Sequence, residues 1–471
     1  MRILLLAMPD TVSLIDYYSR MPNLALVSLA GNLAGHDVKV FDLVTVKPRV
    51  RRHLEKLLRD FRPEVVGVSA MTFQYDSLLR VARFIRGVDP AIRIVAGGYH
   101  PSLMADEMDA DLLDFVVRGE GEITLRELVD GLQNPRADFG SIRGLSFKSE
   151  DGRWTHNEDR PLTSLNGLPL PRRDGRVTDG YHILGNKLDV AETSRGCPYL
   201  CRFCSITRMY GSQFRTFPIA RIVTDLEAVK ARGTRAVFFA DDNITHDPDH
   251  FAKVCRAIID HRLNSMWYTT QMTAVGIARN PELVRDMKRA RFRLVFVGFE
   301  TMDPAALRDL KKPTTPDLNA KAAELLRKHG IAVIAGCIFG YPDDTRESIV
   351  AGFKLIMRLK PDLIYAQYLT PYPKTPLRDE LISAGLVANE KDFSAYDGFT
   401  CNVRTRHLSC QELSRLLQRQ LLLYNIDPQL ILANQILRVQ PLSLIRAAGK
   451  AALSHLRRLR MGGDRQKSLD L

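Results

Sequence analysis

The sequence predicts an α/β protein in which a doubly wound N-terminal domain is followed by a partial (β/α)6 barrel and a helical C-terminal tail. Three observations carry this prediction. Short apolar runs alternate with amphipathic helical segments in both halves of the chain, the pattern of parallel sheets with helical crossovers. A stretch rich in turn residues separates the halves. After about residue 376 the strand pattern stops and helical spacing replaces it.

The chain length agrees with this division. At 471 residues, 45% hydrophobic and 26% charged, it is long enough for two or three globular domains. The expected boundaries are 1–133 for the first domain, 134–186 for a linker that carries a hairpin around 144–157, 187–376 for the barrel, and 377–471 for the tail.

The N-terminal part alternates strand and helix signals from its first residues. Strands are expected at 2–8, 38–43, 64–72, 92–100 and 115–122, and helices at 23–37, 51–61, 77–88 and 123–132. A parallel sheet of this kind binds ligands beyond the carboxyl ends of its strands. Two of those ends, 97–101 and 119–122, are rich in glycine, so backbone can approach a large flat ligand closely. Tight turns alone are the simpler explanation of these glycines.

The second half repeats the alternation. Strands are expected at 188–196, 236–242, 265–273, 293–300, 332–340 and 362–370, with helices such as 219–233, 318–330 and 347–359 between them. A full barrel of this type has eight β/α units, so six predict a barrel that is open along one side.

Three cysteines lie close together directly after the first barrel strand. Cys197, Cys201 and Cys204 follow the spacing C-x3-C-x2-C, in a chain that has 7 Cys in total. They therefore occupy a loop at the carboxyl ends of the strands, where such folds hold their active sites. Three thiolates can hold three irons of a cubane and leave the fourth iron open to bind a small molecule, whereas four cysteines would give a closed electron carrier.

Cysteines this close together could also bind zinc or form disulfides. Structural zinc needs four ligands, and the remaining cysteines are scattered, but a Cys-x2-Cys pair is a common zinc element, so zinc stays open. Disulfides are not expected, because the short apolar start is ended by Pro9 and Asp10 before a signal-peptide core could form. The expected location is the cytoplasm, where thiols stay reduced.

The cysteine motif, with Phe203 just before its last cysteine, resembles the signature of the radical S-adenosylmethionine (SAM) enzymes. The resemblance implies a [4Fe-4S] cluster that binds SAM at its open iron and cleaves it with one electron to a 5′-deoxyadenosyl radical. It also implies an electron donor such as flavodoxin or ferredoxin.

The same resemblance assigns SAM-binding roles to residues near other strand ends. Asp241 or Asp242 would contact the SAM amino group, and Glu300 would contact the ribose or carboxylate side of SAM. Gln271 ends the third strand, and Phe203 belongs to the cysteine motif. The glycine motif near the adenine would comprise Gly336, Ile338 and Gly340. In the proline-rich segment 370–377, Lys374 stands where the family commonly has Gly. A helix cap, a surface ion pair or a satisfied core group would explain each polar residue equally well on its own.

A doubly wound domain before such a barrel resembles the cobalamin-binding class of radical SAM enzymes. The resemblance covers about residues 1–370 and implies a Rossmann-like cobalamin-binding domain. Residues that would line the corrin are Ser69, Gly97, Gly98, Tyr99, Gly119, Glu120, Gly121 and Glu122. Stretch 9–23 contains no His, and His36 is expected in a surface turn, so we expect cobalamin to bind without a protein histidine on cobalt.

The resemblance implies that methyl transfer to an unactivated carbon is the most common reaction of the class. A radical cyclase, an oxygen-inserting enzyme or a rearrangement enzyme of the tetrapyrrole or hopanoid type is the alternative. A transfer-RNA-modifying radical SAM enzyme would explain the net charge of +13. It would normally carry an appended RNA-binding module, and no such module is evident, so no nucleic acid is expected. A non-enzymatic corrinoid-binding module would leave the cysteines unexplained.

The tail offers one indication of the substrate class. Segment 441–460 sets leucines among Arg446, Lys450 and Arg457, the pattern of a basic amphipathic helix. Such a helix can lie peripherally on an acidic membrane surface, which would favour a lipid or other hydrophobic substrate. Packing of its apolar side on the core is the alternative.

Overall fold

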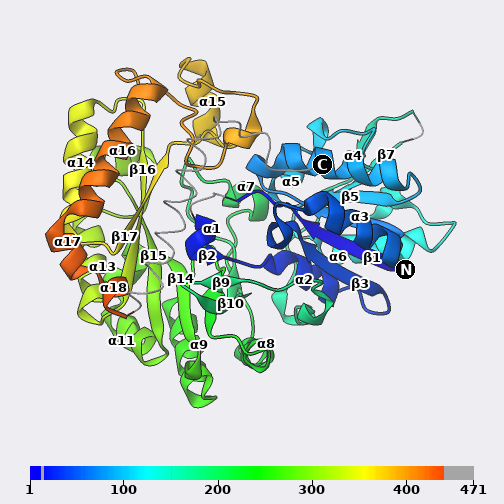
Figure 1. Ribbon diagram of the computed structural model, residues 1–471, viewed down its shortest axis with the longest axis horizontal. Coiled ribbons are helices and arrows are strands. Elements are labelled where there is room, and N and C mark those ends of the chain that lie inside the picture. The colour runs from blue at the N-terminus through cyan, green and yellow to red at the C-terminus, as the bar shows by residue number, and fades with distance from the viewer. Residues whose placement is uncertain (12–14, 150, 440–470) are drawn as a thin grey trace. The chain divides into compact units, whose positions relative to one another are not determined.

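The computed structural model describes residues 1–11, 15–149, 151–439 and 471, and the chain divides into two compact units (Figure 1). Among the described residues up to 439, one unit comprises Met1–Asp16 and Pro22–Tyr181, and the other comprises Tyr17–Met21 and the chain from His182 to residue 439. Within the described ranges, none of the helices combines the length and the apolar character that crossing a bilayer requires. The expected basic helix at 441–460 lies outside the described residues.

The N-terminal unit is built on one seven-stranded sheet. Its strand order is β3-β1-β4-β5-β6-β7-β8, and the first five of these strands are parallel. The strands are β1 (Arg2–Ala7), β3 (Asp37–Asp42), β4 (Val65–Ser69), β5 (Arg93–Gly97), β6 (Phe115–Val117), β7 (Leu145–Lys148) and β8 (Trp154–His156). The strand order reverses at β1, as in a doubly wound fold, so the predicted doubly wound sheet is confirmed.

Helices connect the parallel strands of this sheet. They are α2 (Leu24–Gly31), α3 (Val50–Phe61), α4 (Tyr75–Val88), α5 (Tyr99–Leu103) and α6 (Gly121–Leu132), after the short α1 (Ile15–Tyr18). Alternate strand residues such as Leu5 and Val95 form one buried cluster with Leu26 of α2 and Leu128 of α6. Because successive strand residues point to opposite faces, Leu4 and Ile94 are buried on the other face.

The turn-rich segment between the two sheets adds a hairpin to the first sheet. Its hairpin, β7–β8, forms within the predicted range 144–157, and β7 pairs antiparallel with β6. The sheet of the N-terminal unit therefore continues into the segment that composition suggested was a linker. Tyr181, near the end of that segment, is buried in the same unit.

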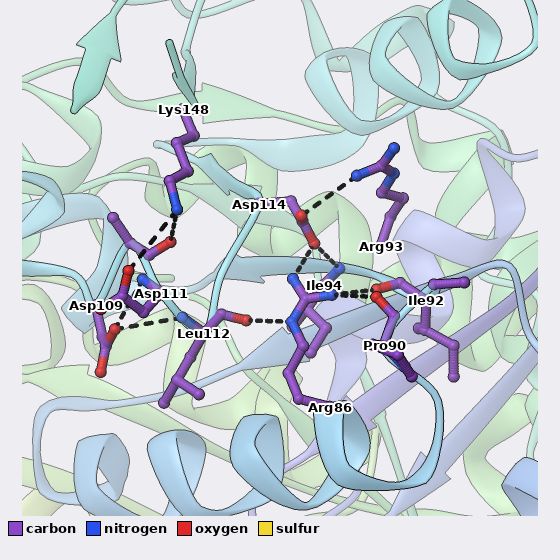
Figure 2. Close-up of polar contacts among 12 residues, drawn as sticks. Arg86, Pro90, Ile92, Arg93, Ile94, Asp109, Asp111, Leu112, Asp114 and Lys148 are labelled. Carbon is purple, nitrogen blue, oxygen red and sulfur yellow. Dashed lines mark hydrogen bonds and ion pairs between the residues drawn. The ribbon is translucent and has the colours of Figure 1, made fainter. Parts of the chain in front are cut away.

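A polar network fixes the amino ends of β5 and β6 (Figure 2). The Arg86 guanidinium of α4 forms an ion pair with Asp114 and donates to the carbonyls of Ile92, at 2.7 Å, and Leu112, at 3.2 Å. The Asp114 carboxylate also accepts the Ile94 amide at 2.7 Å. These contacts stabilise the edge of the sheet opposite to the carboxyl ends of its strands.

The second unit contains an eight-stranded sheet in the order β17-β16-β15-β14-β13-β10-β9-β2. Six strands are parallel: β10 (Asn186–Ala191), β13 (Ala236–Phe239), β14 (Trp267–Thr273), β15 (Phe292–Glu300), β16 (Ala332–Phe339) and β17 (Leu363–Tyr368). Two short antiparallel strands, β9 (His182–Ile183) and β2 (Ser19–Arg20), extend one edge. In the described part of the chain β17 and β2 do not pair with each other, so the predicted open six-unit barrel is confirmed.

Helices follow the barrel strands as the sequence pattern predicted. They are α7 (Ile206–Tyr210), α8 (Ile219–Ala231), α9 (Pro248–Asp260), α10 (Ala274–Arg279), α11 (Pro281–Arg289), α12 (Pro304–Asp309), α13 (Pro316–Lys328) and α14 (Arg346–Arg358). Beyond the last strand, the described tail contains α15 (Pro376–Ser383), α16 (Cys410–Ile426), α17 (Pro428–Ala433) and α18 (Gln435–Val439). An apolar cluster of Leu188, Trp267, Leu294 and Ile436 fills the amino end of the barrel.

Candidate functional site

The cysteine loop is closed at its base by a two-stranded ribbon. β11 (Ser194–Arg195), just after β10, pairs antiparallel with β12 (Arg215–Thr216). Gly196 follows β11 with a φ of +87°, and a Cβ at this position would lie 2.0 Å from the Gln213 carbonyl oxygen. Only glycine therefore fits where the loop leaves the ribbon.

The three cysteines of this loop are free and half-buried. Burial raises the pKa of the Cys197 thiol, that of Cys201 to about 11 and that of Cys204 to about 12. The Cys204 amide donates to the Cys201 carbonyl oxygen at 3.1 Å, which keeps these two cysteines close together. A metal cluster would supply the positive charge that thiolates need at this buried position.

The donor set fits a cubane better than a single ion. Among the described residues, no group of three His, Cys, Asp or Glu side chains is placed to hold one metal ion. In a [4Fe-4S] cluster each thiolate binds a separate iron, so three sulfurs around a loop do not need to converge on one point. A structural zinc site would require that convergence and a fourth ligand.

Asp241 anchors the strand that leads into the loop. Its carboxylate is completely buried and accepts hydrogen bonds from the Thr193 amide, at 3.1 Å, the Thr193 hydroxyl, at 2.6 Å, and the Ser194 hydroxyl. Burial raises the pKa of Asp241 to about 7. The expected contact with SAM does not fit this geometry, because the side chain faces the backbone of the neighbouring strand and is sealed from solvent.

Its neighbour Asp242 is half-buried and contacts the cysteine loop directly. The Asp242 carboxylate accepts the Gly196 amide at 2.8 Å. Next along the chain, the Asn243 amide donates to the Cys197 sulfur at 3.6 Å. Gln271 of β14 in turn donates to the Asp241 carbonyl oxygen at 2.9 Å. The structure thus brings both aspartates and Gln271 together beneath the loop, as parts of its support.

Glu300 is the last residue of β15 and has a strained backbone conformation. It has a φ of +60°, and the pairing of β15 with β16 shifts register between Gly298 and Glu300. A non-glycine residue in this region costs about 1–3 kcal/mol, which the surrounding structure must offset. The Glu300 carboxylate forms an ion pair with Lys312, and each side chain is 10% exposed.

Sequence reasoning missed Lys312. It follows α12 in a run of two lysines, which by itself looks like a solvated surface segment. In the structure its ammonium lies 5.9 Å from the centre of the Phe203 ring. Burial by itself lowers the pKa of Lys312, but Glu300 and the Cys201 thiol outweigh this and raise it. The only sequence signal was its place 12 residues after Glu300, which does not distinguish it from Lys311.

The predicted glycine motif lies on β16 beside the cysteine loop. A Cβ on Gly336 would lie 2.3 Å from the Phe296 ring, so this glycine makes room for an aromatic side chain of β15. Gly340 has a φ of +89° and donates its amide to Asp344 at 3.0 Å. Ile338 and Phe203 pack in the same apolar cluster, so two of the predicted SAM-binding residues meet there.

Lys374 occupies the position in the proline-rich segment where the resemblance predicts glycine. Its φ is +60°, a conformation that favours glycine. The backbone at this position therefore has a conformation that glycine adopts more easily than lysine.

The N-terminal unit gathers the predicted corrin-lining residues at the carboxyl edge of its sheet. Ser69 ends β4, Gly97 ends β5, and Tyr99 begins α5. Gly98 has a φ of +91°, and a Cβ there would lie 2.9 Å from the Ala70 carbonyl oxygen. Gly98 is thus required by the close approach of two loops, whatever binds above them.

The residues of the last glycine-rich turn differ in what surrounds them. Gly119 has a φ of +72°, and a Cβ there would meet nothing within 4 Å, so the backbone is open at this point. Glu120 lies at the N-cap position of α6, and a Cβ on Gly121 would lie 3.1 Å from Leu29. Glu122 is buried and accepts the Ser28 hydroxyl at 3.1 Å, which ties α6 to α2. Glu122 therefore does not present its carboxylate at the edge, contrary to the expectation.

Two histidines of this unit have side chains that are largely shielded from solvent. His36 lies in a turn as expected, but its ring is 8% exposed and contacts the N-terminal amine and Asp130, so the surface position was wrong. His100 follows the end of β5, and its ring contacts that of Tyr75 at a tilt of 41°, with the ring centres 4.5 Å apart. Burial lowers its pKa to about 4, which keeps the ring neutral at physiological pH.

Comparison with known families matches both units. The B12 binding domain matches residues 11–129, and the radical SAM superfamily matches residues 191–356. The first covers four of the five parallel strands of the N-terminal sheet, β3, β4, β5 and β6, with the glycine-rich turns that follow β5 and β6. The second begins at the end of β10 and includes the cysteine loop and four of the following barrel strands.

Individual relatives align over most of the chain. An uncharacterised methyltransferase of Pyrococcus horikoshii is 29% identical over 91% of this chain and 94% of its own. The anaerobic magnesium-protoporphyrin IX monomethyl ester cyclase of a Synechocystis species is 27% identical over 75% of this chain and 71% of its own.

A solved structure shares the fold. The radical SAM methyltransferase TsrM from Kitasatospora setae, with cobalamin and a [4Fe-4S] cluster bound, superposes with a TM-score of 0.69 at 21% identity, over 81% of this chain and 75% of that one. With a three-thiol loop on an open barrel and a B12-type sheet in the same polypeptide, this chain belongs to the cobalamin-binding radical SAM family.

Proposed function

We propose that this protein is a cobalamin-dependent radical SAM methyltransferase that transfers a methyl group from SAM to an unactivated carbon of a hydrophobic small molecule. The observation that carries the proposal is the combination in one chain of a three-cysteine loop and the open carboxyl edge of a B12-type sheet. A relative named as a methyltransferase aligns over 91% of the chain, which supports methyl transfer over ring closure.

Separate sets of residues would bind the two cofactors. Cys197, Cys201 and Cys204 would hold a [4Fe-4S] cluster, and the carboxyl edge at Ser69, Gly97 and Gly119 would face cobalamin. When bound, the cluster and SAM supply a radical that abstracts hydrogen, and cobalamin supplies a methyl group. Asp242 and Asp241 hold the cysteine loop in place through Gly196 and Thr193.

Aromatic side chains support a hydrophobic substrate. Phe296 of β15 and Tyr365 of β17 meet edge to face at 5.6 Å, and Tyr365 meets Phe399 in the same way at 4.8 Å. All three rings are partly exposed on the barrel unit. Aromatic faces of this kind favour apolar or planar ligands. An electron donor of the flavodoxin or ferredoxin type completes the proposed system.

Reconstitution without oxygen tests the proposal. The protein is loaded with iron, sulfide and cobalamin, then supplied with SAM carrying a deuterated methyl group and a chemical reductant. We expect an iron–sulfur absorbance shoulder together with corrin bands, formation of 5′-deoxyadenosine, and the deuterated methyl group on cobalamin. Formation of 5′-deoxyadenosine without label on cobalamin would instead indicate the cyclase type of reaction.

Cysteine variants locate the chemistry. Changing Cys197, Cys201 or Cys204 to Ala removes one of three iron ligands, so cluster assembly and 5′-deoxyadenosine formation should both be lost. Cys410→Ala, which removes a half-buried thiol from the tail, is the matched control and should keep both. SAM cleavage that survives in a loop variant would refute the cluster assignment.

A further inference from the structure

A buried ion pair lies beside the cysteine loop. Lys312 comes from the segment after α12, Glu300 from the strained end of β15, and their side chains are each 10% exposed. Gly298 leaves room for this pair, because a Cβ there would lie 2.6 Å from the Glu300 carboxylate and 3.1 Å from the Lys312 ammonium. Two charges this far from water are stable only with close partners.

The cation of this pair faces the loop as well as Glu300. Its ammonium lies over the ring of Phe203, the residue directly before Cys204. The preceding carbonyl, of Lys311, lies 3.8 Å from the Cys201 sulfur. The positive charge of Lys312 therefore lies next to the cysteine loop.

A cluster held by three thiolates is negatively charged, and it becomes more negative by one unit when it takes up an electron. A fixed positive charge nearby stabilises the reduced form more than the oxidised form, and a fixed negative charge does the opposite. Because both side chains are largely shielded from water, the effect of each is screened less than at the surface.

We infer that Lys312 is a positioning residue for the cluster, whose buried positive charge raises the reduction potential, while Glu300 fixes the ammonium and partly opposes it. The inference rests on the proposed function, since it requires a cluster at the three cysteines. Lys312 belongs neither to the cysteine motif nor to the predicted SAM-binding positions. The potential that its charge sets for the cluster determines how strong a reductant the electron donor must be.

Redox titration of the reconstituted holoenzyme, followed by electron paramagnetic resonance, tests the inference. Lys312→Met should shift the midpoint to more negative potential, with about a tenfold lower ratio of reduced to oxidised cluster at a fixed potential, or about 59 mV for one electron. Glu300→Gln should shift it the other way, because the ammonium is then unopposed. The double variant should fall between the two, and Lys312→Arg should stay near the wild type.

Lys311→Met is the matched control, since it removes the same charge from an exposed side chain one position away. Its midpoint should equal that of the wild type. An unchanged midpoint in Lys312→Met, or equal shifts in both lysine variants, would overturn the inference. If Lys312→Met holds too little cluster to titrate, Glu300→Gln decides alone, because no shift or a negative shift there contradicts it. Failure of the wild-type protein to assemble a cluster would instead remove the proposed function.

Discussion

The amide of Gly196 donates a 2.8 Å hydrogen bond to the carboxylate of Asp242, joining the start of the cysteine loop to the end of the neighbouring strand. The two residues are 46 positions apart in the chain. Parallel pairing of β10 with β13 brings them together, so the loop takes its shape from the sheet beneath it. Loop geometry and barrel topology are therefore coupled.

Removing the acceptor should loosen the loop. Asp242→Ala leaves the Gly196 amide without this carboxylate, a loss of about 1.5–3 kcal/mol for a hydrogen bond to a charged group. We expect iron retained after gel filtration of reconstituted protein to fall severalfold. Asp242→Asn keeps an acceptor oxygen and should retain most of the iron. Equal iron content in Asp242→Ala and the wild type would contradict the anchoring role.

The glycine at the loop start should tolerate no side chain. Gly196→Ala forces a Cβ to 2.0 Å from the Gln213 carbonyl oxygen at a φ of +87°. Gly211→Ala is the matched control, because its φ is +62° but a Cβ there meets nothing within 4 Å. The control should cost only the backbone penalty of about 1–3 kcal/mol, since its ψ is −163°, and it should keep its cluster. Gly196→Ala should lose the cluster, as measured by iron and sulfide content.

The buried carboxyl of Asp241 should make stability depend on pH. Its folded-state pKa is about 7, raised by burial from the ordinary 3.8, so the folded state favours the protonated form. Its contribution is fully present below about pH 4 and is lost as the pH rises toward 7 and through it. Wild type should therefore lose stability relative to Asp241→Asn across this window, by at most about 1.4 kcal/mol per pH unit. Denaturant unfolding of both proteins at several pH values measures the difference, and parallel pH profiles would refute the shift.

Gly119 should matter for cobalamin more than for folding. Gly119→Ala puts a methyl group into the open space at the carboxyl edge, at a φ of +72°. Gly35→Ala carries a comparable backbone penalty, with a φ of +81° and no contact within 4 Å, in the turn before β3. Both variants should lose about 1–2 kcal/mol of stability. Only Gly119→Ala should weaken cobalamin binding in an absorbance titration; equal affinities would move the corrin away from this turn.

Arg86 should be the main stabiliser at the amino edge of the first sheet (Figure 2). Its side chain is 20% exposed, and Arg86→Met leaves Asp114 without its main partner, at a cost of about 2–4 kcal/mol. Arg93 pairs with the same Asp114 at 3.5 Å but is 58% exposed, so Arg93→Met should cost less than about 1 kcal/mol. Thermal unfolding of the two variants compares them directly, and similar losses would contradict the assignment.

Much of the fold was predictable because strand and helix periodicity are local. The six barrel strands and the five parallel strands of the first sheet were all expected from apolar runs of the right length. The hairpin β7–β8 was expected too, but not its pairing with β6, since which strands pair depends on contacts distant in sequence. Lys374 shows the same limit: its +60° φ is a backbone property that its residue type conceals.

The sequence by itself determined the three-cysteine loop, its place after the first barrel strand, and the glycine-rich turns of the first sheet, because spacing and turn chemistry act within a few residues. Only the tertiary structure decided that Asp241 and Glu122 are buried anchors and that Lys312 faces the cysteine loop with Glu300 as its partner. The physical reason is that burial and charge pairing arise where strands far apart in sequence meet, and a carboxylate or an ammonium looks the same in the chain whether it will meet water or a buried partner.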